Sequence, residues 1–559
     1  MDQRIAAATR PDAENAERSA VRRDAIVDSW LQNHGHLVAI AIVAAGFAFR
    51  IFTASQSYLN PDEALHYLLI NQRSLWLAYK ASLTNAHPPL IYVILYFWHF
   101  LDQSELFLRL PSVIMGTAFC WVLYKWIGVL FGRTAGLIGL ILAAFSPALI
   151  ALSAEVREYA VLLFCMTCAL YFLARALEEK SVRKMWYFSG FLYLAILSHY
   201  SAVFFTLSVG VYALARLADS RPPWKLAVAW AGGQAVALGI YIFLYITHVS
   251  KIRHSITLWA MPFDSDYFHV GQGSIFTFTR VNTLNIFTFL FGQRSVAVLM
   301  LLVFIAGIAF LFGRDLLSRR ESAPSSRLGI LILFPFLAVW GASIAGIYPY
   351  IGSRHTVFLA PFIIACVSYL LAAVSGKKLW VGLLAVALLM TVANSFASPI
   401  DELELSSGNH SPAVMAAAVN YMEHTIPRGD LILVDYQSSL QLSFYLCGPK
   451  NIIPIQAFRN QYFEFSCNGY PVIPLQAWKL IAQGFPLQFE KMARDHGLHP
   501  GEKVWVYQSG WGPSLGPDLA EKSPKFRCLA PKIFGGTVTV TRFVVGPDFL
   551  PAPPSQACP

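Results

Sequence analysis

The chain has 559 residues, of which 56% are hydrophobic and 13% are charged. Soluble domains carry roughly 25% charged residues, so this chain has about half the usual supply of solvated side chains. Most of its apolar stretches are about 17–23 residues long and lack charge, which is the length that crosses a bilayer. These features exclude a chain of about three or four ordinary soluble domains and predict a polytopic membrane protein.

The net charge of +10 is unevenly distributed, because residues 1–399 hold 30 of the 42 Lys and Arg. The basic residues of this part lie in short loops between apolar stretches. Lys and Arg in short loops mark the cytoplasmic side of a membrane protein. The excess therefore indicates orientation and gives no reason to expect a nucleic-acid partner.

The basic clusters also limit the number of membrane crossings. Two clusters on the same side of the membrane must be separated by an even number of crossings. We expect residues 1–36 to be a cytoplasmic segment that leads into an uncleaved first span, and residues 37–397 to form the membrane domain. Ile91–Leu101 is short, so we expect it to lie along the outer interface. Eleven spans are expected, at about 37–49, 108–130, 135–152, 160–177, two short crossings within 186–217, 226–246, 296–312, 328–347, 357–374 and 379–396.

An odd number of crossings places the rest of the chain, residues 398–559, on the extracytoplasmic side. Its composition is that of an ordinary soluble domain, with a predicted helix capped by Ser411-Pro412 and ending near His424. We expect a second helix near 438–446 and strands near 431–434, 504–507 and 538–545. The pattern predicts a small α/β domain of about 150 residues.

The cysteines divide between the two parts. Four lie within apolar stretches, where free Cys behaves as a small hydrophobe. The other four lie in the tail, where an extracytoplasmic location would permit one or two disulfides, with the connectivity left open. The tail cysteines are Cys447, Cys467, Cys528 and Cys558.

Carboxylates follow the first expected span, in the sequence Asn60-Pro61-Asp62-Glu63. Pro61 suits the first turn of a helix, which puts Asp62 and Glu63 at its positive end. That location favours ionised carboxylates, as a base or a metal ligand requires. The alternative is that the two residues merely cap an interfacial helix.

Two further outer loops carry charged and aromatic residues. His87 opens a His-Pro-Pro-Leu element and could hydrogen-bond a phosphate or a sugar hydroxyl, although a structural histidine is the alternative. The next loop contains Glu155, Arg157 and Tyr159. Glu155 and Tyr159 would share a helical face if the fourth span began early, and Arg157 offers a planar fork for phosphate or carboxylate. A local ion-paired turn would explain the same charges.

The remaining outer positions are His199, between the two short crossings, and Arg354-His355, before the tenth span. Arg354 and His355 should lie at the depth of the lipid headgroups, where an anionic lipid phosphate lies. Snorkelling to ordinary phospholipid is the alternative. The sequence contains no convincing Walker loop, zinc-protease motif or serine-hydrolase motif.

Taken together, these elements resemble the GT-C superfamily of glycosyltransferases. Four motifs occur here in the order in which this superfamily has them. They are the acidic pair after span one, His-Pro-Pro-Leu, Glu-Val-Arg-Glu-Tyr after span three and Ser-His-Tyr after span five. The closest resemblance is to glycosyltransferase family 39 and its bacterial relatives, of the protein O-mannosyltransferase and aminoarabinose-transferase type. The resemblance covers about residues 37–375, and many relatives have Glu-Ala-Arg-x-Tyr where this chain has Glu-Val-Arg-Glu-Tyr.

The resemblance implies inverting transfer of a sugar from a polyprenyl phosphate, on the outer side of a bacterial inner membrane. Asp62 matches the catalytic aspartate of the family, and Glu155 lies where the family has its second acidic residue. Because phosphate is a good leaving group, the reaction needs a base for the acceptor hydroxyl and cations for the phosphate. We expect Asp62 as the base, with Arg157 and Arg354, and also Lys80 or His355, as the cations.

Several properties remain open at this stage. No cofactor is established, although a divalent metal held by Asp62, Glu63 and Glu155 is an option. The acceptor is a lipid, a glycan or a protein of the envelope. A transporter of lipid-linked substrates is the main alternative, but transporters usually show paired repeats and charges at mid-membrane depth. A catalytically inactive assembly protein of the same fold is another alternative.

Overall fold

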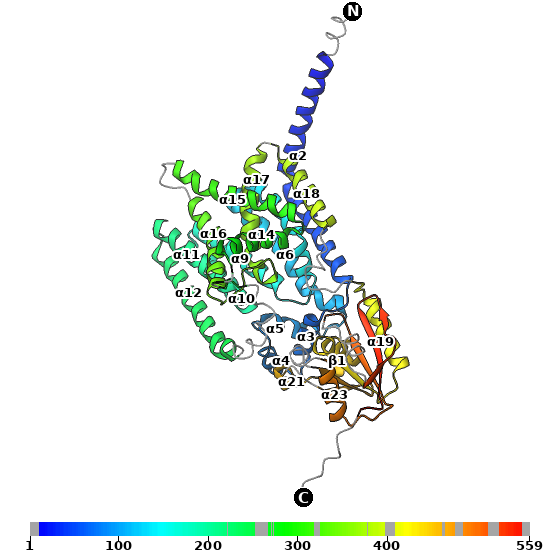
Figure 1. Ribbon diagram of the computed structural model, residues 1–559. Coiled ribbons are helices and arrows are strands. Elements are labelled where there is room, and N and C mark those ends of the chain that lie inside the picture. Colours follow the sequence, from blue (N-terminus) through cyan, green and yellow to red (C-terminus); the bar gives the residue numbers. More distant parts are fainter. Residues whose placement is uncertain are drawn as a thin grey trace, which may run out of the picture.

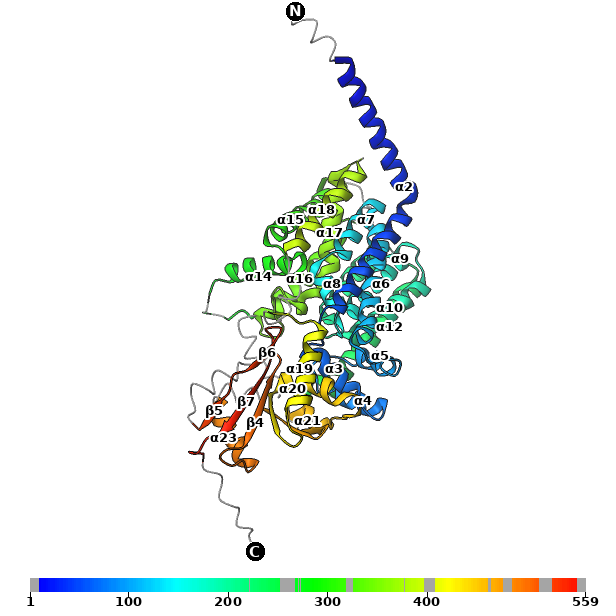
Figure 2. The same cartoon turned by 90° about the vertical axis from the view of Figure 1, so that its right-hand side faces the viewer.

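A helical bundle and an α/β domain make up the protein, seen in a computed structural model (Figure 1). The long helix α2 (Arg10–Ser55) extends from one end of the bundle, and the α/β domain lies at the other end in both views (Figures 1 and 2). The structure describes residues 10–220, 222–251, 267–269, 271, 273–317, 325–376, 378–396, 408–460, 464–475, 485–511 and 525–549.

Eight helices among the described residues are long and apolar enough to cross a membrane, or nine if a bent pair counts as one span. The bent pair is α7 (Arg133–Ala144) with α8 (Pro147–Ser153), which meet at 61°. Two shorter apolar helices accompany them, α14 (Ile275–Phe291) and α18 (Leu379–Phe396). The other long helices are α6 (Glu105–Phe131), α9 (Tyr159–Glu178), α10 (Val182–Ser198), α11 (Ala202–Ser220), α12 (Trp224–Leu244), α15 (Arg294–Leu317), α16 (Ser325–Ile344) and α17 (Ala360–Ser375).

Each of the eleven spans expected from the sequence overlaps a helix of the structure, so the prediction of a polytopic helical protein is confirmed. The number of crossings stays a prediction, because α10 and α18 do not meet the length and composition of a span. The break expected at His199-Tyr200 is present, since α10 ends at Ser198 and α11 begins at Ala202. The domain boundary expected at 397/398 lies outside the described residues.

The break between α7 and α8 is held by a buried arginine from α2. Arg50 donates to the carbonyl oxygens of Ala143 and Ala144, at 3.2 and 2.9 Å. These carbonyls lie at the carboxyl end of α7, which lacks intrahelical partners and carries partial negative charge. Arg50 therefore stabilises the bend, and α8 then leads directly into the second outer loop at Ala154.

Three short helices lie between the bundle and the α/β domain (Figure 1): α3 (Pro61–Ile70), α4 (Leu75–Ser82) and α5 (Leu90–Trp98). At 8 to 10 residues each, they are too short to cross a bilayer. The helix α5 corresponds to the stretch expected to lie along the interface. These helices therefore form a layer at one end of the bundle.

The α/β domain contains one mixed sheet with the strand order β2-β3-β1-β4-β7-β5, and β6 also pairs with β7. The central strands β3, β1 and β4 are parallel, and the other pairs are antiparallel. Its strands are β1 (Leu431–Asp435), β2 (Phe465–Cys467), β3 (Tyr470–Leu475), β4 (Lys503–Gln508), β5 (Phe526–Cys528), β6 (Lys532–Phe534) and β7 (Val538–Val545), and its helices include α19 (Pro412–Thr425), α20 (Tyr436–Leu442), α21 (Ile455–Asn460) and α23 (Phe485–Asp495).

Alternate residues of the central strands form two cores, one on each face of the sheet. Leu433 and Val506 pack with Phe489 of α23 on one face. Ile432 and Val434 pack on the other face, in a cluster that includes Met415 of α19. The structure confirms the helix expected at 411–424, which is α19, and the strands expected at 431–434, 504–507 and 538–545. The second expected helix, near 438–446, corresponds to α20 and the π-turn Ser443–Cys447 that follows it. One disulfide joins Cys447 to Cys467.

The α/β domain is anchored to the segment that precedes α3. Gln441 donates to the carbonyl oxygen of Leu59 at 2.7 Å, and the Leu59 amide donates to the hydroxyl of Tyr445 at 2.7 Å. Tyr445 also donates to the carboxylate of Glu105, at the start of α6. Since Leu59 lies three residues before Asp62, the α/β domain helps to fix the position of the acidic loop.

The first prediction concerns sidedness. The basic loops predict that the start of α2 lies in the cytoplasm, and the α/β domain lies at the opposite end of the bundle (Figure 1). We expect alkaline phosphatase, which folds actively only outside the cytoplasm, to be active when fused after Pro559. The same reporter inserted in the basic sequence between α15 and α16 should be inactive. Activity of a cytoplasm-only reporter at Pro559 would contradict this topology and would move every candidate site residue to the other side.

Candidate active site

The first outer loop ends in a fully formed capping box. The side chain of Asn60 accepts from the Glu63 amide at 2.9 Å, and the side chain of Glu63 accepts from the Asn60 amide at 2.9 Å. Pro61 occupies the first turn of α3. These contacts fix the start of the helix, so Asp62 is held at its amino-terminal end, where the helix dipole favours a negative charge.

The two adjacent carboxylates of this loop have different surroundings. Glu63 is buried and receives two parallel hydrogen bonds from the Arg109 guanidinium, at 2.7 and 2.6 Å. It also accepts from the Val156 amide at 2.9 Å. Both oxygens of Glu63 are thus occupied by the protein itself. These contacts favour a structural role for Glu63 over the substrate contact expected from the sequence.

Asp62, by contrast, has a side chain that is 41% exposed and faces two arginines. Its Oδ2 lies 2.8 Å from Nη1 of Arg157 and 3.3 Å from Nη1 of Arg354. Partial burial raises the pKa of this carboxyl, but the two guanidinium charges outweigh it and hold the pKa well below its usual range. Asp62 is therefore an ionised carboxylate, accessible and flanked by two cations.

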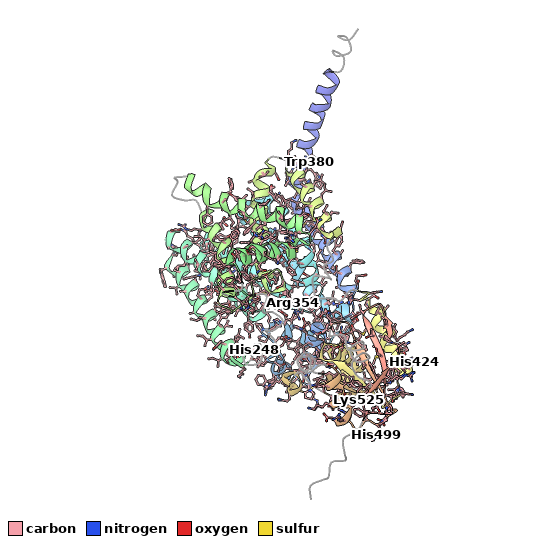
Figure 3. The ribbon with its side chains drawn as sticks, in the orientation of Figure 1. His248, Arg354, Trp380, His424, His499 and Lys525 are labelled. Atoms are coloured by element: carbon pink, nitrogen blue, oxygen red, sulfur yellow. A yellow bond between two sulfur atoms is a disulfide. The ribbon has the colours of Figure 1, made fainter. Side chains whose placement is uncertain are left out.

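Arg157 and Arg354 come from distant parts of the chain. Arg157 belongs to the loop before α9 and is buried, with its guanidinium 5.6 Å from the ring of Tyr159. Arg354 begins a 3₁₀ turn (Arg354–Leu359) before α17 and lies where the bundle faces the short helices (Figure 3). The structure therefore brings both arginines that were expected to bind phosphate to the same carboxylate.

Glu155 lies close to this group but outside any helix. The helix α9 begins at Tyr159, so the shared helical face considered for Glu155 and Tyr159 does not form. Burial and the nearby negative charge of Glu63 raise the pKa of Glu155 to about 7, against the effect of the neighbouring arginines. Its Oε1 lies 3.4 Å from the side-chain nitrogen of Asn60.

Glu158, in the same loop, is fully buried and was not singled out from the sequence. Its Oε2 lies 3.3 Å from Nε2 of His66, and its Oε1 lies 3.2 Å from Nδ1 of His87. His66 in turn donates from Nδ1 to the carbonyl oxygen of Asp62 at 2.7 Å. The spacing of Asp62 and His66, four residues apart on a helix, was the one signal in the sequence for this link.

The other expected site residues have different positions. His199 is buried, and its ring centroid lies 5.5 Å from that of His87 and 5.3 Å from that of Tyr159. His355 follows Arg354, and its carbonyl oxygen accepts from the Tyr348 hydroxyl. Lys80 is exposed on α4, where its ammonium lies 4.9 Å from the centre of the Trp76 ring. Lys80 is thus not among the cations paired with Asp62.

The α/β domain also reaches this site. Tyr436, the first residue of α20, is buried, and α20 packs against α3. Burial raises the pKa of the Tyr436 hydroxyl, and the negative charge of Asp62 raises it further. The domain therefore covers the site on the side away from the bundle, as Figure 2 shows for α20 and α3. Nothing in the sequence pattern indicated this contact.

A comparison of the sequence with protein families matches residues 86–246 to the family described as dolichyl-phosphate-mannose-protein mannosyltransferase. The matched segment includes His87, Glu155, Arg157 and His199, whereas Asp62 and Arg354 lie outside it. None of the curated proteins compared with this sequence matches it.

Solved structures resemble the chain over most of its length. ArnT from Cupriavidus metallidurans bound to undecaprenyl phosphate is 15% identical, with a TM-score of 0.52 over 91% of this chain and 98% of ArnT. Its apo state gives a TM-score of 0.50 with the same identity and coverage. An oligosaccharyltransferase from Archaeoglobus fulgidus, tethered with an acceptor peptide, is 12% identical, with a TM-score of 0.49 over 86% of this chain and 70% of that one.

These comparisons confirm the resemblance inferred from the loop motifs. The chain is a multi-pass membrane protein with the GT-C fold, and it resembles glycosyltransferases of family 39. The identity to ArnT is low, so this likeness extends to the fold alone. The donor, the acceptor and the roles of individual residues have to be argued from the site.

The second prediction concerns the buried pair of Glu63 and Arg109. In Arg109→Met, Glu63 would keep its charge in a buried position without its partner. Breaking a buried ion pair in this way typically costs about 3–5 kcal/mol. We therefore expect a large loss of stability, measured as unfolding of the purified protein in detergent by heat or denaturant.

The matched control is Arg175→Met, which removes an arginine that is 34% exposed from its ion pairs with Glu178 and Glu179 at the surface. Exposed pairs contribute roughly 0–1 kcal/mol after screening by solvent, so this variant should unfold almost like the unaltered protein. Equal stabilities of the two variants would show that the Glu63–Arg109 pair does not hold the loop.

Proposed function

We propose that this chain is a membrane glycosyltransferase that moves a hexosyl or pentosyl group from a polyprenyl phosphate to an envelope acceptor. The reaction would occur on the extracytoplasmic face of the bacterial inner membrane and would invert the anomeric carbon. The observation that carries the proposal is an accessible carboxylate, Asp62, held between the guanidinium groups of Arg157 and Arg354. The GT-C fold and the match to the mannosyltransferase family support it.

The two arginines suit a phosphate that leaves with the polyprenyl chain. A guanidinium presents several N–H donors in a plane, and phosphate oxygens accept them strongly. Arg354 has a side chain that is 19% exposed, so it can reach a headgroup, whereas Arg157 is only 3% exposed and provides a fixed charge. Together they would stabilise the negative charge that develops on the departing phosphate.

Asp62 is the proposed general base for the acceptor hydroxyl. In the resting site its pKa lies well below the usual range, which makes it a weak base. A donor phosphate would compete with Asp62 for Arg157 and Arg354, because each guanidinium would then share its hydrogen bonds with the phosphate. The pKa of Asp62 would rise toward its ordinary value, so Asp62 would become a better base when the donor is bound.

Inversion follows from direct displacement. The acceptor oxygen attacks the anomeric carbon on the face opposite the leaving phosphate, and its proton passes to Asp62. The C–O bond to the phosphate breaks as the new glycosidic bond forms. No acid is required, because phosphate leaves as a stable anion.

The third prediction is that Asp62→Asn reduces transfer by about 10²–10⁴-fold, the usual contribution of a positioned base. Asparagine keeps the shape of the side chain but does not take up a proton at working pH. The measurement is single-turnover transfer from a polyprenyl-phosphate sugar that is already bound. Donor binding should persist, because Arg157 and Arg354 remain.

The control is Asp102→Asn. It changes another outer-loop aspartate, whose oxygens accept hydrogen bonds from the neighbouring Ser104, and it should leave transfer unchanged.

The pH dependence of transfer shows whether Asp62 or Glu155 is the base. A base with a pKa far below neutrality is ionised throughout the range from about pH 6 to 8, so transfer should be nearly constant. If Glu155, with a pKa of about 7, were the base, transfer would rise as the pH passes 7. A rising profile with an active Asp62→Asn would disprove the assignment.

The fourth prediction concerns the donor phosphate. Arg354→Lys keeps the charge but loses the planar fork, so donor affinity should fall by about tenfold or more, since a hydrogen bond to a charged group contributes ~1.5–3 kcal/mol. Arg354→Ala should weaken binding further. The measurement is equilibrium binding of the polyprenyl-phosphate sugar, with Arg73→Lys as the control in an exposed outer loop. Unaltered affinity in Arg354→Ala would indicate that Arg354 only contacts ordinary headgroups.

A further inference from the structure

Three potential metal ligands converge beside the candidate active site. They are His87, Glu158 and His199, and one ligand atom from each lies within 4.8 Å of the other two. Among the residues that the structure describes, this is the one group of three or more such side chains. The ligands come from three separate outer loops, before α5, before α9 and after α10. They differ from the acidic set considered from the sequence, in which Glu63 is occupied by Arg109.

Two of the converging atoms have no hydrogen-bond partner in the described structure. Nδ1 of His87 and Oε1 of Glu158 are both buried, and although they lie 3.2 Å apart, neither forms a hydrogen bond. A buried polar atom left without a partner typically costs about 1–3 kcal/mol. The Glu158 side chain is fully buried, so bulk water does not solvate the carboxylate. A cation between these atoms would satisfy both at once.

We propose that His87, Glu158 and His199 bind one divalent transition-metal ion of the Zn²⁺ type. Two imidazole nitrogens and one carboxylate oxygen are ligands that Zn²⁺ accepts, whereas Mg²⁺ and Ca²⁺ prefer oxygen ligands alone. Three protein ligands leave a fourth tetrahedral position open, as in catalytic rather than structural zinc sites. The proposal concerns binding by the resting protein and does not depend on the proposed transfer reaction.

The surroundings of the ligands suit this role. Oε2 of Glu158, the oxygen that faces away from His87, lies 3.3 Å from His66, and His66 binds the backbone of Asp62. Metal ligands are commonly oriented by such contacts of their remaining atoms. A metal bound here would therefore join three outer loops and, through Glu158 and His66, support the helix turn that carries Asp62.

His199 needs a change of tautomer to act as a ligand. The Ser201 amide donates to Nδ1 of His199 at 3.1 Å, and the Ser201 hydroxyl lies 2.8 Å from the same atom. If the metal binds Nε2, the proton has to lie on Nδ1, where it is donated to the Ser201 hydroxyl, and the hydrogen bond from the Ser201 amide is lost. Ser201→Ala should therefore weaken metal binding without removing a ligand.

The charges near the site tolerate a cation. Asp62 faces Arg157 and Arg354, and Glu63 faces Arg109, whereas Glu158 lies beside His66 and His87. Glu155 adds a fourth acidic group. A divalent ion would therefore make the site positive only when it is bound. A positive site is suited to an anionic ligand.

The experiment uses the full chain, purified in detergent and stripped of metal with a chelator. Zn²⁺ is titrated in competition with a chromophoric chelator, and Co²⁺ is used separately because its visible d–d bands report tetrahedral nitrogen and oxygen ligands. We expect one equivalent of metal per chain. His199→Asn and Glu158→Gln should each weaken binding by at least about 10–100-fold, and Ser201→Ala by about that range.

The matched control is His99→Asn. His99 is a buried histidine at the end of α5 whose Nδ1 binds the Tyr96 carbonyl, away from the three ligands. This variant should keep one equivalent of metal and the Co²⁺ bands. If Glu158→Gln does not fold, because Glu158 also contacts His66, His199→Asn still tests the site. Absence of metal binding in the unaltered protein, or the same affinity and Co²⁺ spectrum in His199→Asn, would overturn the proposal.

Discussion

The buried ion pair between Glu63 and Arg109 is the interaction on which the site depends. Arg109 also donates to the carbonyl oxygens of Ala54, Ser57 and Tyr58, where α2 ends and the first outer loop begins. Glu63 in turn accepts from the Val156 amide in the second outer loop. One guanidinium and one carboxylate thus join α2, α3, α6 and the loop before α9. Because Glu63, Arg109 and Val156 are buried, bulk water does not replace their contacts if the pair is broken.

This constraint explains why two adjacent carboxylates act differently. Successive residues of a helix point in directions about 100° apart, so Glu63 faces the bundle when Asp62 faces the outer boundary. Asp62 is left accessible to substrate while its backbone is fixed by the cap and by His66. The α/β domain completes the arrangement from the opposite side, through Gln441 and Tyr445 on Leu59. If Asp62 is the base, as proposed, its position on so short a helix needs this support on both sides.

The balance of charge indicates how such a site would tolerate the proposed anionic donor. Asp62 and Glu63 each have a guanidinium beside them, and the most accessible pair, Asp62 with Arg354, could exchange partners if a phosphate bound. The more deeply buried Arg157 would stay in place and offset part of the charge of the phosphate. Binding of the donor and activation of the base would then be the same event, because both follow from the redistribution of the two guanidinium groups.

The sequence by itself determined the architecture and most of the members of the site. Long apolar stretches without charge indicate membrane spans, and the short apolar segments of the tail, bounded by turn residues, indicate the strands of the α/β domain. Asp62, Arg157 and Arg354 were selected because charges next to spans are costly. The partners of these residues were decided only by the tertiary structure. Arg109 lies inside an apolar helix and Glu158 within a motif of several charges, and no spacing connects either to Glu63 or His87. Whether a buried charge is structural or available depends on which groups surround it, and these come from loops distant in the chain.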